Sequence, residues 1–181
     1  MWPTVKKIAR RAAPWILLVV GIYWLSGAAG SGKGGGAAEF PLGGRLPPLA
    51  IELADGSRVL VPPRSGGSEV LVLNFWASYC APCRAEAPIL SSLHAREAGA
   101  VRVIGLGIEG TPRAEMLLAA EDFGMRYPIA PADLELLNRL RVRAVPTTYV
   151  IAKDGVITLS RIGVVTENEL EAAIASAKRR G

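Results

Sequence analysis

The two cysteines of this chain, Cys80 and Cys83, stand where a buried strand gives way to a helix. The apolar run 70–76 before them is nearly unbroken, as expected of a central strand covered on both faces. An amphipathic helical pattern follows, and Pro82 fits its first turn, where a missing N–H costs nothing. Because the free N–H groups and the macrodipole of a helix start stabilise a thiolate, Cys80 is expected to be the attacking sulfur. Cys83, one turn further along and deeper, can then resolve a mixed disulfide.

Basic charge is concentrated in residues 1–33, which carry five basic and no acidic side chains. The remaining residues hold sixteen of each sign, so the net charge of +5 belongs to the N-terminal segment. We therefore expect no nucleic-acid partner for the folded part, which lacks a basic footprint. Two cysteines are also too few for the disulfide framework of a small secreted fold.

Residues 12–32 form an uncharged stretch of 21 residues, about the length that a helix needs to cross a bilayer. Basic residues precede the stretch, so the N-terminus is expected to stay in the cytoplasm. We predict a signal anchor with a single transmembrane helix at 1–33, a flexible linker at 34–45, and a folded domain at 46–181 on the periplasmic side of the cytoplasmic membrane. A cleaved signal peptide and a buried core helix are the alternatives for the first segment.

Beyond the linker, hydrophobic patterns and turn signals predict an alternation of strands and helices. Asp55-Gly56 provides a tight turn between the first two strands. Thr111 is expected to cap the second helix, and Thr166 with Glu169 forms a capping box for the last one. Strands are expected at 49–53, 58–61, 70–76, 101–108, 145–152 and 156–161, and helices at 82–98, 112–123, 133–140 and 166–180. This order predicts an α/β fold, with a mixed sheet and helices on both of its faces.

The stretch F-W-A-S-Y-C-A-P-C, followed by Pro88 and much later by V-P-T-T-Y-V-I, resembles the thioredoxin superfamily. More narrowly, residues 46–180 are similar to the membrane-tethered, extracytoplasmic thioredoxin-like proteins of the TlpA, ResA and cytochrome-c-maturation type. The resemblance implies a thioredoxin fold, in which three α/β/α layers contain a mixed sheet, with an added N-terminal strand pair at 49–61. It also implies that Cys80 and Cys83 form a redox-active disulfide, with Cys80 as the nucleophile.

The resemblance implies further residues at a substrate-binding surface. Pro146 is expected to be a cis-proline that faces the disulfide. The backbone of Val145 would then be free to pair with a substrate strand, with Thr147 beside it. Trp76 and Tyr79 are assigned to the same surface, although Trp76 also fits a core role.

Two positions bear on proton transfer. Asn74 occupies the place of a buried Asp in thioredoxin, and an amide cannot transfer a proton as that Asp does. Glu86, three residues after Cys83, matches a Glu of ResA-like members. We assign Glu86 as a candidate proton acceptor near Cys83 or a substrate contact, and a solvated helix residue is the alternative.

The resemblance implies a thiol–disulfide oxidoreductase that reduces disulfides in partner proteins, such as apocytochrome c or other envelope proteins. A membrane protein that relays thiol electrons would regenerate it, and neither a metal nor an organic cofactor is required. The C-A-P-C motif lacks the His of strongly oxidising relatives, which favours a reductant or an intermediate reduction potential. A disulfide-forming oxidase with the same residues, and a thioredoxin-fold binding module without turnover, are the alternatives.

Three other types of site compete for these motifs. A structural zinc site needs four N or S ligands, whereas the chain offers two Cys and one His, His94. A merely structural disulfide across three residues would add little loop entropy. Gly105 to Gly110 reads G-x-G-x-x-G between a predicted strand and a predicted helix, as a dinucleotide-binding fingerprint does. Only 71 residues follow Gly110, too few for the usual doubly wound sheet, so we rank dinucleotide binding below redox chemistry.

Overall fold

The computed structural model describes residues 40–62, 69–108, 110 and 112–180. The division of the chain falls between Gly36 and Ala37, so all the described residues belong to the second unit. The predicted anchor at 1–33 and the linker up to residue 39 lie outside the described residues. Within the described ranges, no helix is both long and apolar enough to cross a membrane.

A five-stranded mixed sheet lies at the centre of the described residues, in the order β5-β4-β3-β6-β7. β4 runs parallel to β3 and to β5, whereas β6 runs antiparallel to β3 and to β7. Every residue of β3 is buried, which confirms the prediction of a central strand covered on both faces. The strands are β3 (Val70–Trp76), β4 (Val101–Gly107), β5 (Ile129–Pro131), β6 (Thr147–Ile151) and β7 (Ile157–Ile162).

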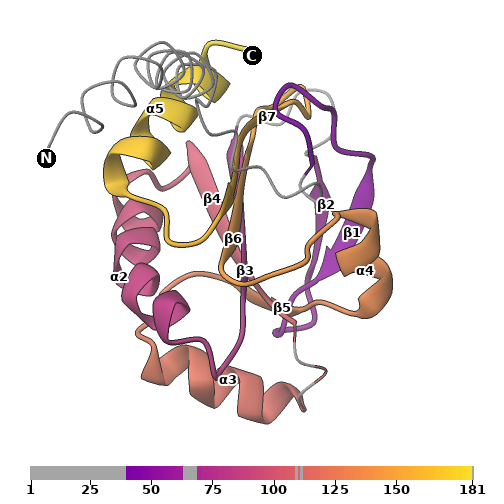
Figure 1. Ribbon diagram of the computed structural model, residues 1–181, viewed down its shortest axis with the longest axis vertical. Helices are drawn as coiled ribbons and strands as arrows, with labels where there is room; N and C mark the ends of the chain where they lie inside the picture. The colour runs from indigo at the N-terminus through magenta and orange to yellow at the C-terminus, as the bar shows by residue number, and fades with distance from the viewer. Residues whose placement is uncertain (1–39, 63–68, 109, 111, 181) are drawn as a thin grey trace, which may run out of the picture. The chain divides into compact units, whose positions relative to one another are not determined.

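Helices and a hairpin cover the two faces of the sheet (Figure 1). Three helices, α2 (Ala81–Arg96), α3 (Arg113–Asp122) and α5 (Glu167–Lys178), pack their apolar side chains on one face. The antiparallel hairpin of β1 (Leu49–Glu52) and β2 (Arg58–Val61) covers the other face together with the short helix α4 (Leu134–Arg139). The expected strand pair is therefore present, and it supplies much of the second outer layer, where a helical layer was expected.

Local signals set several of the element boundaries. The Thr166 hydroxyl accepts a hydrogen bond from the Glu169 N–H, and the Glu169 carboxylate accepts one from the Thr166 N–H, which confirms the capping box of α5. α3 begins at Arg113, with Pro112 at the N-cap position, and the expected cap Thr111 lies outside the described residues. β5 is absent from the sequence-based prediction, because its three residues are too few to show an alternating pattern.

The end of the predicted linker already belongs to the folded unit. The Gly43 N–H donates to the Ile157 carbonyl at 2.9 Å, and Arg45 forms an antiparallel bridge with Val156. The prediction of a flexible linker up to residue 45 is therefore wrong for 43–45. Backbone pairing with the start of β7 holds these residues, and glycine-rich composition does not reveal such a long-range partner.

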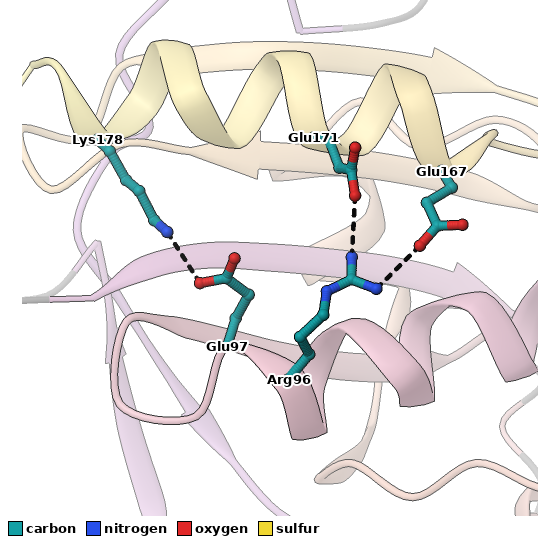
Figure 2. Close-up of polar contacts among 5 residues, drawn as sticks. All are labelled: Arg96, Glu97, Glu167, Glu171 and Lys178. Carbon is teal, nitrogen blue, oxygen red and sulfur yellow. Dashed lines mark hydrogen bonds and ion pairs between the residues drawn. The ribbon is translucent and has the colours of Figure 1, made fainter.

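Exposed ion pairs join the end of α2 to α5, which lies beside it (Figure 2). The Arg96 guanidinium contacts the carboxylates of Glu167 and Glu171, at 2.9 and 3.1 Å. Glu97, directly after α2, pairs with Lys178 at 2.8 Å. Because these side chains are partly in solvent, the pairs add little to stability, and the buried apolar side chains of both helices in one core cluster matter more.

Candidate active site

The two cysteines form a disulfide at the start of α2. Cys80 is the N-cap residue of the helix, and its sulfur accepts a hydrogen bond from the Cys83 N–H at 3.2 Å. Both residues are buried, and Cys80, the expected attacking residue, is the more exposed of the two, at 6% against 2% for Cys83. The predicted strand-to-helix junction is confirmed, and the helix end places an N–H donor and partial positive charge against the Cys80 sulfur.

A buried polar network lies between α2 and the sheet. The Asn74 side-chain amide donates to the Thr148 hydroxyl at 3.0 Å, and that hydroxyl donates to Oε1 of Glu86 at 3.1 Å. The Val165 N–H donates to the same carboxylate oxygen at 3.3 Å. Glu86 is fully buried, so the alternative of a solvated helix residue is wrong. Its carboxyl is held by groups 62 and 79 residues further along the chain, which no local pattern displays.

Burial makes Glu86 a proton-exchanging group near neutral pH. It raises the pKa of Glu86 from an ordinary value of 4.5 to about 7, against the opposing effect of the hydrogen bonds from Thr148, Val165 and Asn74. A carboxyl with this pKa is both a usable acid and a usable base at pH 7. Asn74 does not titrate, and it orients the Thr148 hydroxyl toward the carboxyl instead.

The loop before β6 contains a cis peptide bond between Val145 and Pro146, as predicted. The Pro146 carbonyl accepts from the Gly163 N–H at 2.8 Å, and the Thr147 hydroxyl donates to the Ala144 carbonyl at 2.7 Å. Neither the N–H nor the carbonyl of Val145 has a hydrogen-bond partner among the described residues. Of the three predicted substrate-binding residues here, Pro146 and Thr147 are buried and Val145 is half-buried.

The side chain of Val145 packs against the same apolar cluster that contains Cys80 and Cys83. Thr147 pairs with Phe75 near the end of β3, so the loop before β6 lies at the end of the sheet from which the chain runs on to Cys80. The two aromatic residues predicted to contact the substrate differ in their exposure to solvent. Tyr79 is 74% exposed, whereas Trp76 is fully buried and packs against Phe123 at 5.6 Å between ring centroids. This burial favours the core role for Trp76 over direct contact with a substrate.

The glycines of the G-x-G-x-x-G pattern have a packing role. Gly105 and Gly107 lie inside β4, not in a loop between a strand and a helix. A Cβ at Gly105 would lie 2.8 Å from Ile129 Cδ1, and one at Gly107 would lie 2.8 Å from Met116 Sδ. These glycines let neighbouring side chains approach the sheet, so the pattern does not form a phosphate-binding loop.

The described part of the chain brings no three His, Cys, Asp or Glu side chains together as a metal site would. The ring of His94 is half-buried, and its Nδ1 accepts from the Val103 N–H at 3.4 Å. Burial lowers the pKa of His94, so its ring is neutral and bonded to the backbone of β4. These contacts fit a structural histidine packed against the sheet better than a metal ligand.

Comparison with known proteins gives a consistent result. A family model described as Redoxin matches residues 43–174. The thioredoxin-like protein YneN of Bacillus subtilis (strain 168) is 26% identical over 131 residues, which cover 71% of this chain and 76% of YneN. The thiol-disulfide oxidoreductase ResA of Geobacillus kaustophilus (strain HTA426) is 31% identical over 109 residues, 59% of this chain. The match spans only 62% of the length of that ResA.

A solved structure supports the same fold. The crystal structure of a thiol:disulfide interchange protein of the thioredoxin family from Chlorobium tepidum TLS has a TM-score of 0.63 at 19% identity. The superposition covers 77% of this chain and 99% of the other. At this identity the likeness shows the fold alone, and it confirms the thioredoxin-like α/β arrangement expected from the sequence.

Proposed function

This chain belongs to the Redoxin family, and from that premise we propose that it reduces disulfide bonds in partner proteins on the outer side of the cytoplasmic membrane. Its chemistry is that of a thiol–disulfide oxidoreductase. The observation that carries the proposal is the Cys80 sulfur at a helix N-cap, with the buried carboxyl of Glu86 on the same helix as Cys83. The first arrangement favours a nucleophilic thiolate, and the second provides a base for the other thiol.

In the first step, the Cys80 thiolate of the reduced protein attacks one sulfur of the partner's disulfide. A bond forms between Cys80 and that sulfur, while the partner's S–S bond breaks and its second sulfur leaves as a thiolate that takes up a proton. The Cys83 N–H and the macrodipole of α2 stabilise the attacking thiolate. An extended segment of the partner pairs with the free backbone groups of Val145.

In the second step, the Cys83 thiol gives its proton to Glu86 and attacks the Cys80 sulfur. The bond between Cys80 and the partner breaks, and its electron pair leaves on the partner's sulfur, which is then protonated. Two electrons have passed from the cysteine pair to the partner, and the Cys80–Cys83 disulfide remains, as in the structure. The cysteine pair supplies both electrons, and the partner's two sulfurs take one proton from Glu86 and one from solvent, so the reaction needs neither a metal nor an organic cofactor.

Regeneration and location complete the proposal. The uncharged stretch 12–32 behind a basic start supports a single-pass anchor with the redox domain outside the cytoplasmic membrane. In that setting a membrane protein of the thiol-relay type returns the disulfide to the dithiol. Apocytochrome c and other envelope proteins with disulfides are the clients that this type of protein serves, through cytochrome c-type biogenesis among other routes.

Trapping of the mixed disulfide tests the mechanism. Cys83→Ser in the full chain should accumulate a covalent complex with client protein on non-reducing gels, because the resolving thiol is gone. Cys80→Ser, its matched control, should accumulate none. If neither variant traps a partner, or if the double Cys→Ser variant keeps full function, the exchange mechanism is wrong and a binding module is favoured.

The direction of electron flow has its own test. Equilibration of the Cys80–Cys83 pair against glutathione buffers of known potential should give a reducing value, near those of thioredoxin-type reductants. A strongly oxidising value would replace the proposed reductase by a disulfide-forming oxidase that uses the same residues.

A further inference from the structure

Three buried polar atoms on the helix-covered face of the sheet have no hydrogen-bond partner in the described part of the chain. They are Nε1 of Trp76, Oε2 of Glu86 and the hydroxyl of Tyr127. Native structures rarely leave such groups unpaired, because each one forfeits its hydrogen bonds to water. Because three such groups lie in one region, one common cause is the simplest explanation.

The geometry of the sheet places these groups together. A Cβ on Gly105 would lie 3.0 Å from Cε2 of Tyr127 and 3.3 Å from Nε1 of Trp76, so both rings meet over this glycine. Gly105 is paired with Asn74 across the sheet, and Asn74 is paired with Thr148 on its other side. Residues at paired positions point to the same face, so the glycine lies under the network that holds Glu86.

The three groups are chemically complementary. The indole N–H is a donor only, an ionised carboxylate is an acceptor only, and a tyrosine hydroxyl is both. Burial, and in addition the charge of Glu86, raise the pKa of Tyr127, so its hydroxyl stays protonated and able to donate. A chain from Trp76 through Tyr127 to Glu86 would satisfy all three atoms.

We propose that Tyr127 is a positioning residue for the thiol–disulfide exchange: its hydroxyl donates a hydrogen bond to Oε2 of ionised Glu86, directly or through one water, and so sets how readily Glu86 takes the proton of Cys83. The inference rests on the proposed function for its role in exchange. The hydrogen bond itself does not, and it can be measured without turnover. Tyr127 lies two residues before the start of β5, so the omission of this strand from the sequence prediction also hid the residue.

Few titratable groups share this environment within the described residues. The buried face of α2 presents Cys83 beside Glu86, the segment before β5 presents Tyr127, and α3 contributes apolar groups. β3 and β6 present amide and hydroxyl groups, and the turn before α5 presents the Val165 N–H. No charged side chain is among the causes that shift the pKa of Glu86. In the oxidised protein, where Cys83 does not titrate, a change at Tyr127 therefore acts on one carboxyl.

The test titrates Glu86 by carbon-13 NMR in the full oxidised chain, in detergent solution, with labelled glutamate and with Glu86→Gln to assign the resonance. The wild-type carboxyl should titrate at a pH of about 7. Tyr127→Phe keeps the ring and removes the donor to the ionised form, so the midpoint should rise by about 1, which is a tenfold loss of acidity. Site-specific 3-fluorotyrosine at position 127 makes the hydroxyl a stronger donor, so the midpoint should fall.

The matched control is Tyr149→Phe, which removes a hydroxyl that donates to the Leu140 carbonyl at 2.9 Å on the opposite face of the sheet. It should leave the Glu86 midpoint unchanged. A midpoint that stays put in both Tyr127 variants overturns the inference, even when Cys83→Ser still traps a client. If trapping fails while the midpoint moves as expected, the proposed function is wrong and the Tyr127 hydrogen bond stands.

Discussion

Replacement of Glu86 by Gln should change how the stability of the fold depends on pH. The folded protein binds the Glu86 proton more tightly than the unfolded chain, since its pKa is about 7 in the fold against 4.5 ordinarily. The contribution of the neutral carboxyl is therefore fully present below pH 4.5 and is lost as the pH rises through about 7. The gap of roughly 2.5 between the two values corresponds to about 3 kcal/mol of unfolding free energy.

Gln keeps the shape of the side chain and stays neutral at every pH. Its extra N–H groups lower the stability by an amount that does not depend on pH. The informative quantity is therefore how the difference in unfolding free energy between the variant and the wild type changes with pH. The unfolding free energy of Glu86→Gln minus that of the wild type should rise by about 3 kcal/mol between about pH 4.5 and about pH 8.5. Urea unfolding of the oxidised proteins measures it, because disulfide-bonded cysteines do not titrate in that range.

The exposed Glu115 supplies the control, since Glu115→Gln removes a carboxylate of the same kind from the surface of α3. The rise of about 3 kcal/mol expected from a buried carboxyl should be absent for Glu115→Gln. A flat curve for Glu86→Gln as well would refute the reasoning, because it would mean that burial leaves the affinity of this carboxyl for its proton unchanged.

Two further changes probe the packing around the site. Gly105→Ala should lower the unfolding free energy by about 1–3 kcal/mol, because its Cβ would lie 3.0 Å from Cε2 of Tyr127 and 3.3 Å from Nε1 of Trp76, two buried rings. A denaturation midpoint equal to that of the wild type would show that the neighbouring rings yield freely. Thr166→Ala removes the side-chain cap of α5 and should lower stability by about 1 kcal/mol, measured by thermal unfolding with Thr166→Ser as the conservative control. Equal losses from both substitutions would exclude the hydroxyl as the cause.

Elements with local signals could be predicted from the sequence. The unbroken apolar run of β3, the Asp55-Gly56 turn and the capping box at Thr166 each lie within a few residues, and each is found where it was expected. The cysteine pair at the start of α2 belongs to the same class, because a helix terminus and its cap are set by neighbours in sequence.

The proton chemistry of the site could not be predicted in the same way. The environment of Glu86 is made by Thr148 and Val165, which only the folded sheet brings to α2. Tyr127 belongs to no helical or alternating pattern. Gly105 beneath it is part of a pattern typical of nucleotide binding, and the sequence does not show that this glycine leaves room for two rings. Composition and periodicity report which residues are inside, but not which buried polar groups meet.

The amide that Val165 offers to Glu86 belongs to the turn directly before the C-terminal helix. The position of the final helix therefore affects the proton chemistry of the cysteines, although it does so through a single hydrogen bond from the Val165 N–H to Glu86. Any truncation or fusion that lifts this turn off α2 would take a donor from the ionised carboxylate and leave it a weaker acid. The pKa of Glu86, in a site built around residue 80, would then change with the position of roughly the last fifteen residues of the chain.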